Sequence, residues 1–299
     1  MSDVDALITR TAGAQLPPGL TGYAAYLLRR AHVLANRLAP TFDEAADGAG
    51  SARDFHVLDA LGEPGAAYSQ QDLGDRLGIN RTTMVKLIDR FEAAGQVTRA
   101  RNPDDRRSYV LALTAGGRAA VKAMDPAVSA ADDQLTADLS AAERDRLDAL
   151  LSALLSRPAP GPGAPGRTGS LITQAHHLVR HRIEAALTGS GLQARHFGAL
   201  AVLADAACSQ QLLARRLAIS EQAVLQVVDD LERAGRVARD RDPQDRRRYA
   251  LRITEPGRAA LLATRHVVEA AEAETATALG ADGRAELAGL LAALLRADD

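Results

Sequence analysis

Two short arginine-rich segments hold the residues of this chain that are best suited to binding anions. They lie 140 positions apart and consist of Asp105, Arg106 and Arg107 in the first and Asp245, Arg246, Arg247 and Arg248 in the second. The guanidinium group is planar, permanently charged and weakly hydrated, so it suits phosphate oxygens and narrow negative grooves. The stretches 97–118 and 237–258 each carry a net charge of +3, whereas the whole chain carries −2. The charge pattern therefore predicts local phosphate-binding surfaces on a nearly neutral protein.

The arginine-rich segments belong to a long internal repeat. Ser69–Ala120 aligns without a gap on Ser209–Ala260, and 25 of the 52 residues are identical. A spacing of 140 residues is far longer than the period of a solenoid, so each copy is expected to be a whole domain.

Each copy contains the signals for two helices, a hairpin and a long helix. Ser69 and Gly78 bound a short helix, and Asn80 is a good N-cap for a second helix that runs to Ala94. In that helix Met84, Leu87, Ile88 and Phe91 fall on one face, as Val224, Val227, Val228 and Leu231 do in the second copy. Two strands joined by a turn follow, and Thr114 and Thr254 cap long helices. The predicted fold class is mainly α with small β-hairpin wings: two winged helix-turn-helix domains, each flanked by helices suited to dimerisation.

Composition shifts along the chain divide it into four parts. We expect a flexible N-terminal arm at 1–19 and a first domain at 20–156, which begins with a helix over Leu20–Ala39. A linker at 157–168 contains four Pro and three Gly, and a second domain fills 169–299.

The repeated motifs resemble those of the MarR family of bacterial transcription regulators. The resemblance rests on Asp-Pro-x-Asp-Arg-Arg in the hairpin (Asn102-Pro in the first copy), the Leu-x-Leu/Ile-Thr that follows, and Gly-Arg soon after. It implies that Asp105 orients Arg107, and Asp245 orients Arg247, for entry into the DNA minor groove. It also implies that the flanking helices form a dimer interface. Family members are ordinarily homodimers of one-domain chains, so the two halves joined here are expected to pair internally, and whether two chains pair further stays open.

The same resemblance places the recognition helices at Asn80–Ala94 and Ser220–Ala234. The first has a net charge of +1 and the second −3, which predicts closer reading of one half-site than of the other. The candidates for DNA contacts are Arg81, Thr82, Thr83, Lys86 and Arg90 in the first helix and Gln222 and Gln226 in the second. Glutamine can read adenine edges in the major groove.

Polar residues on otherwise apolar first helices are candidates for binding a small effector. In the family, effectors bind between the dimer helices and the winged domain, which here points to Arg29, His32, His176, His177 and Arg180. His177 and His181 are spaced for a metal on one helix face, but the pattern lacks a supporting cysteine or acidic ligand apart from Glu184, and we expect no metal and no cofactor.

The remaining features favour a regulator over an enzyme. The 299 residues contain one cysteine, no signal peptide pattern and no run of 18 apolar residues, so a cytoplasmic protein is expected. No catalytic constellation is evident, so an enzyme is not expected. The predicted function is sequence-specific DNA binding by a ligand-responsive repressor, with activation also open. Two alternatives are that only the first domain reads DNA while the second senses or dimerises, and that the protein is an interaction scaffold.

Overall fold

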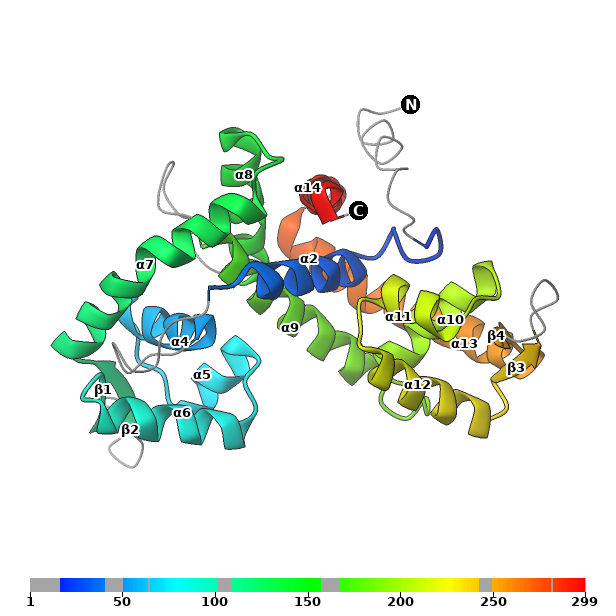
Figure 1. The fold of residues 1–299 in the computed structure, drawn as a ribbon, viewed down its shortest axis with the longest axis horizontal. Helices are drawn as coiled ribbons and strands as arrows, with labels where there is room; N and C mark the ends of the chain where they lie inside the picture. The colour runs from blue at the N-terminus through cyan, green and yellow to red at the C-terminus, as the bar shows by residue number, and fades with distance from the viewer. Residues whose placement is uncertain are drawn as a thin grey trace. The chain divides into compact units, whose positions relative to one another are not determined.

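The computed structural model describes most of the chain. The described residues are 17–40, 51–63, 65–101, 109–156, 167–241, 249–280 and 282–298. They are mostly helical, with two small antiparallel sheets of two strands each, which confirms the predicted fold class (Figure 1). The arm at 1–16, the turn tips at 102–108 and 242–248, and residues 157–166 of the linker lie outside the described residues.

The same order of elements occurs in both repeats. The first repeat contains α2 (Ala24–Leu38), α4 (Ala52–Gly62), α5 (Gln70–Leu77), α6 (Arg81–Ala93), β1 (Val97–Arg101), β2 (Tyr109–Leu113), α7 (Ala115–Leu135) and α8 (Ala141–Leu154). The second contains α9 (Thr168–Ala186), α10 (Ala194–Asp205), α11 (Gln210–Leu217), α12 (Glu221–Arg233), β3 (Val237–Arg241), β4 (Tyr249–Ile253), α13 (Glu255–Leu279), α14 (Gly283–Leu294) and a 3₁₀ turn, η1 (Leu295–Asp298). In both, the hairpin follows the second helix of the helix-turn-helix and leads into a long helix (Figure 1).

The described residues form two compact units, and each unit takes helices from both repeats. The larger unit comprises the described residues within Met1–Leu34, Asp138–Pro160 and Val179–Asp299. The smaller unit comprises those within Ala35–Ala137 and Gly161–Leu178. Helix α2 therefore begins in the larger unit although it opens the first repeat, and α9 begins in the smaller unit although it opens the second.

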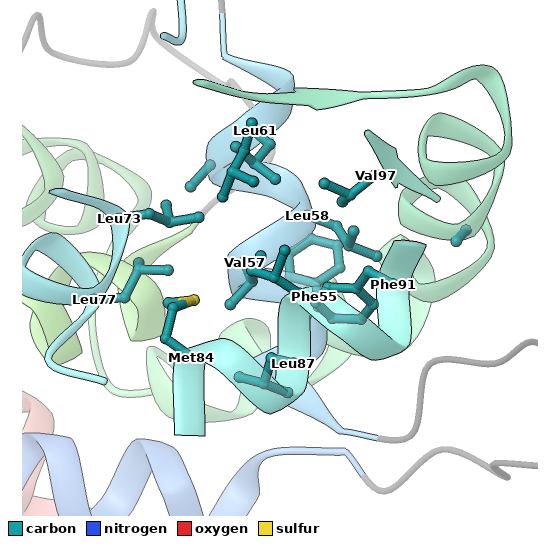
Figure 2. Packing of buried hydrophobic residues seen from close by; sticks show 14 of the residues in the cluster. Phe55, Val57, Leu58, Leu61, Leu73, Leu77, Met84, Leu87, Phe91 and Val97 are labelled. Carbon is teal, nitrogen blue, oxygen red and sulfur yellow. The ribbon is translucent and has the colours of Figure 1, made fainter. Parts of the chain in front are cut away.

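The apolar stripe predicted for α6 forms the centre of the smaller unit. Met84, Ile88 and Phe91 are at most 1% exposed and belong to one buried cluster with Phe55 of α4 and Leu73 of α5. Figure 2 shows Met84, Phe91, Phe55 and Leu73 in this cluster. The corresponding stripe of α12 is also buried: Val224, Val227, Val228 and Leu231. Removing a buried aromatic side chain such as Phe91 costs about 3–5 kcal/mol. The buried stripes of α6 and α12 attach one face of each helix to the core and leave the opposite face exposed.

Local capping sets where the helices begin and end. Ser69 forms a capping box with Asp72, and the Thr83 amide donates to Asn80 Oδ1 at 2.9 Å. Gly78 ends α5 in the left-handed region with φ 65°, and Ala218 adopts the same conformation after α11 with φ 50°. A Cβ atom makes that conformation costly for alanine, so the turn of the second repeat carries local strain that the first avoids.

Each hairpin is hydrogen-bonded to the short segment that precedes the first helix of its helix-turn-helix. β1 pairs with β2 so that Val97 faces Leu113, and β3 pairs with β4 in the same register. The Leu111 amide donates to the Tyr68 carbonyl oxygen at 2.8 Å, and Leu251 donates to Cys208 at 2.8 Å. These hydrogen bonds fix the β1–β2 hairpin to the segment before α5 and the β3–β4 hairpin to the segment before α11. They thereby set the orientation of each hairpin relative to α5 and α6, or to α11 and α12.

Candidate DNA-binding surface

The outward face of α6 carries most of the side chains predicted to contact DNA in the first repeat. Arg81, Thr82 and Lys86 are exposed, while Thr83 is half-buried in the first turn. The buried stripe lies on the other face of the same helix, so the exposed positions share one side. The helix can therefore present two cationic side chains and two hydroxyl groups to a groove.

Arg90 differs from the other candidates on α6 because a buried carboxylate holds it. Its Nη2 lies 2.5 Å from Oδ1 of Asp54, whose side chain is 2% exposed. Asp54 sits in the first turn of α4, where its amide donates to the hydroxyl of Ser51. This ion pair ties the recognition helix to α4, and nothing in the spacing of the sequence pointed to Asp54.

The second repeat has a related contact in which the acidic and basic residues exchange places. Ala-Arg-His-Phe at 194–197 matches Ala-Arg-Asp-Phe at 52–55, so His196 stands where Asp54 does, and Asp230 stands where Arg90 does. His196 Nε2 lies 3.6 Å from Asp230 Oδ2, too far for a direct hydrogen bond. Burial and the nearby Arg195 lower the pKa of His196, while Asp230 opposes that shift. This tie is therefore weaker near neutral pH than the one between Arg90 and Asp54.

The glutamines predicted to read bases lie on the exposed face of α12. Gln222 and Gln226 are both exposed. The Gln226 side-chain amide donates to Asp230 Oδ1 at 2.9 Å, and Arg233 donates to the same oxygen at 3.0 Å. One N–H of the Gln226 amide is thus engaged, and the other N–H and the carbonyl oxygen remain suited to an adenine edge.

One arginine of each hairpin binds two acidic residues of the preceding helix. Arg239 lies 2.6 Å from Asp229 and 2.7 Å from Glu232. In the first repeat Arg99 binds the equivalent Asp89 at 3.0 Å and Glu92 at 2.6 Å. Arg233 is already counted in the net charge of −3, so Arg239 adds one positive charge beside the second recognition helix, as Arg99 does beside the first. The repulsion predicted for the second helix is therefore reduced by one charge, and the charge difference between the two helices is unchanged.

The arginines at the tips of the two wings are outside the described residues. These are Arg106 and Arg107 with Asp105, and Arg246, Arg247 and Arg248 with Asp245. The strands that support them are described, and Arg252 of β4 pairs with Asp240 of β3 at 2.7 Å. The predicted minor-groove contacts remain a prediction.

The candidate effector residues Arg29 and Arg180 lie in the larger unit. Arg29 Nε donates to the Leu217 carbonyl oxygen at 3.1 Å, and Nη2 donates to that of Ala218 at 2.9 Å. Tyr26 donates to the Arg216 carbonyl oxygen at 2.7 Å. These bonds satisfy the last carbonyl groups of α11, next to the turn into α12. Burial lowers the pKa of the Arg29 guanidinium group, and the positive charge of Arg180 lowers it further.

The histidine candidates are less accessible than expected for ligand contacts. His176 is 5% exposed, and its ring centroid lies 5.3 Å from that of His177. His177 lies against Gly78, where an added Cβ would come within 2.1 Å of its ring, and His32 is half-buried in the larger unit. A cavity of about 230 Å³ in the smaller unit is lined by residues of α4, β2 and α7 and by none of the five candidates. Among the described residues no group of three His, Cys, Asp or Glu side chains could hold a metal ion.

Two winged helix-turn-helix motifs with outward recognition helices define a DNA-binding class of protein. Sequence comparison narrows that class. A sequence model of the MarR family matches residues 51–109, and a second MarR-family model matches 190–248. The chain belongs to the MarR family, as its resemblance predicted. It is accordingly a DNA-binding transcription regulator.

Individual relatives each align with less than half of this chain. A putative transcriptional regulatory protein for the hcr operon of Thauera aromatica is 35% identical over 41% of this chain and 78% of its own length. The transcriptional repressor MprA of Escherichia coli is 33% identical over 29% of this chain and 49% of its own length. The Mycobacterium tuberculosis MarR family protein Rv2887, solved with salicylic acid, is 32% identical over 39% of this chain and 87% of that one, with a TM-score of 0.35. No helix within the described ranges is long and apolar enough to cross a membrane.

Proposed function

We propose that this protein is a ligand-responsive repressor whose two repeats act as one intramolecular pseudo-dimer on a single operator. The proposal rests on one observation: in each repeat, an acidic residue of the long helix accepts hydrogen bonds from the start of the first helix of the other repeat. Glu272 of α13 accepts hydrogen bonds from the amides of Ala24 and Ala25 at the start of α2, at 3.0 and 2.9 Å. Asp132 of α7 accepts one from Gly169 near the start of α9 at 2.9 Å. Asp132 and Glu272 are 140 positions apart, so the same site in each repeat caps the first helix of the other.

Residues farther along the two first helices support the same pairing. Arg29 of α2 bonds to the last carbonyl groups of α11, and His177 of α9 lies against Gly78 at the end of α5. Each first helix therefore contacts the turn of the helix-turn-helix in the other repeat. Such reciprocity is what an isologous two-fold interface produces when both copies belong to one chain.

Helices α8 and α14 add a contact between equivalent positions. Arg146 binds Glu286 through two hydrogen bonds, 2.7 Å from Nε to Oε1 and 2.5 Å from Nη2 to Oε2. The two residues are 140 positions apart, and a residue that touches its own equivalent lies close to a two-fold axis. In a homodimer this position would bring two like side chains together.

Arg29 and Arg180 support a response to a small anionic ligand. Both side chains are positively charged, and Arg29 already holds the end of α11 beside the recognition helix of the second repeat. A carboxylate bound to Arg29 would compete with the carbonyl oxygens of Leu217 and Ala218 for its donors. Loss of the bonds to Leu217 and Ala218 would release the turn before α12, which couples ligand binding to DNA release. A repressor role is favoured because the relative MprA is named as one.

Binding of the full chain to DNA tests the proposal directly. A duplex from the protein's own upstream region is titrated with the protein, and the mass of the complex is measured by light scattering. We expect one chain per duplex, lower affinity in the presence of an aromatic carboxylate such as benzoate, and loss of the benzoate effect in Arg29→Ala and Arg180→Ala. Two chains on a duplex trimmed to a single operator would refute the action of one chain per operator, and sequence-independent binding would refute the repressor role.

A further inference from the structure

Each recognition helix exposes one aliphatic side chain at the same repeat position. Among the described residues, Val85 is 37% exposed and Leu225 45%, and the other exposed large apolar residues are Tyr109 and Leu262. Positions 85 and 225 are 140 apart. A single exposed apolar residue is ordinary on a protein surface. The same exposure at one position of both repeats, on the helix of each that faces outward, requires a reason in function or folding.

Folding does not explain these two side chains. The core-facing stripe of α6 is complete without Val85, because Met84, Leu87 and Ile88 are at least 92% buried. In α12, Val224, Val227 and Val228 are fully buried, while Leu225 points to the other side. Each aliphatic side chain thus adds exposed apolar area without adding to the core, and its recurrence at the same position of both repeats favours a shared role at the surface.

The neighbours of these residues identify what covers them. Val85 follows Thr82 by one turn and adjoins Lys86 on the exposed face of α6. Leu225 stands in the same way beside Gln222 and Gln226 on α12. These neighbours are hydrogen-bond donors and acceptors suited to base edges, and an isolated aliphatic group among them is too small for a protein-docking patch. The major groove presents one apolar group on its base edges, the C5 methyl of thymine.

We propose that Val85 and Leu225 read thymine C5 methyl groups, one in each half-site of the operator. This rests on the proposed function in one respect, that both recognition helices enter the major groove. Leucine reaches one carbon farther from the backbone than valine, and the χ1 rotation of valine is restricted in a helix. The two half-sites therefore hold their thymine at different positions relative to the helix. Beside Leu225, Gln222 and Gln226 favour adenine, so the half-site of the second repeat is rich in A·T pairs.

Deoxyuridine substitution tests the proposal because it removes only the methyl group. The probe is a duplex that the wild-type protein selects from a random-sequence pool, and each thymine is replaced singly by deoxyuridine. For the wild type, one replacement in each half-site should weaken binding by about fourfold, the effect of one methyl group leaving an apolar contact. Val85→Ala should bind the parent duplex about fourfold more weakly and lose sensitivity to the replacement in one half-site only. Leu225→Ala should lose sensitivity to the replacement in the other.

Leu262→Ala is the matched control. Leu262 is 65% exposed on α13, which is not a recognition helix, so its removal should change neither the affinity nor the sensitivity to deoxyuridine. The proposal is overturned if both variants keep the wild-type sensitivity, or if no thymine replacement affects the wild type. Failure to select any duplex would instead refute the proposed function, so the two failures are distinguishable. A loss of affinity in Val85→Ala that is equal on all duplexes would indicate a structural role and would also overturn the proposal.

Discussion

Arg146 and Glu286 occupy the same position of the two repeats and bind each other. A homodimer cannot make this contact, because a two-fold axis would place two arginines or two glutamates together. Two repeats within one chain can carry different residues at this position and can therefore make the contact. Glu286 has a pKa below its usual range because Arg146 donates two hydrogen bonds to it, and the pKa of Arg146 is raised by the same bonds. The pair is thus specific to two repeats that differ in sequence at this position.

Charge reversal at this pair should be destabilising singly and neutral when both residues are exchanged. Arg146→Glu and Glu286→Arg should each lower the free energy of unfolding by about 0.5–1 kcal/mol, the range for exposed ion pairs with good geometry. The double variant should recover most of that loss, measured by urea unfolding at low salt. Arg252→Glu, which breaks a pair of similar exposure within one hairpin, is the control. Additive losses in the double variant would show that the two side chains do not interact.

Glu272→Ala should destabilise the protein through the start of α2. The substitution leaves the buried Ala24 amide and the half-buried Ala25 amide without their acceptor, which should cost about 2–3 kcal/mol. The exposed Glu274 serves as the control for loss of a carboxylate on the same helix. Equal stability of Glu272→Ala and Glu274→Ala would argue against the cap.

The same carboxylate predicts a pH dependence. Burial raises the pKa of Glu272 above its ordinary value of 4.5, and the amides of Ala25 and Ala24 oppose the shift. Because the pKa of Glu272 is higher in the folded than in the unfolded protein, its contribution to the free energy of unfolding is full below pH 4.5. That contribution declines as the pH rises from 4.5 through the pKa of the folded state. The unfolding free energy of the wild type relative to Glu272→Gln should therefore fall across the mildly acidic range and then level off. A relative stability that rises with pH would show that the hydrogen bonds outweigh the burial.

Arg90 and Lys86 should separate stability from DNA binding. Arg90→Gln leaves the buried carboxylate of Asp54 without its cation, so we expect a loss of about 3 kcal/mol in unfolding free energy. Lys86→Ala removes an exposed charge and should change stability by less than about 0.5 kcal/mol while weakening DNA binding. Thermal unfolding and titration of a labelled duplex measure the two effects. If Arg90→Gln were as stable as the wild type, the ion pair with Asp54 would not matter for stability, and a direct contact of Arg90 with DNA would be favoured instead.

Arg107→Ala and Arg247→Ala test the two wings. Each should weaken binding to duplex DNA and reduce the slope of log affinity against log salt by about one unit, as loss of one phosphate contact does. The sequence predicts that both arginines lie in wing turns, where substitutions usually change stability by less than about 0.5 kcal/mol, so we expect the fold to be unaffected. Unchanged affinity and slope in both variants would mean that the wings do not reach DNA.

The sequence alone determined the elements of this protein and its family. The α6 stripe, the caps at Ser69, Asn80 and Thr114, and the glycine that ends α5 all act within a few residues of each other. Such interactions leave a readable period or a residue preference in the sequence. The wing motif identified the family in the same way, because its residues are consecutive.

Only the tertiary structure decided which repeat each first helix joins and which charges are engaged. Glu272 meets Ala24 across 248 positions, and Asp54 meets Arg90 across 36. Nothing local marks such partners, because their pairing depends on how helices pack and on which carboxylates that packing removes from water. The charge of α12 shows the consequence: counted along the sequence it is a repulsive helix, but in the folded chain Arg239 reaches back from β3 and places one positive charge between Asp229 and Glu232. Coulomb energy depends on distance in space and on local solvent, and neither is written in the order of the residues.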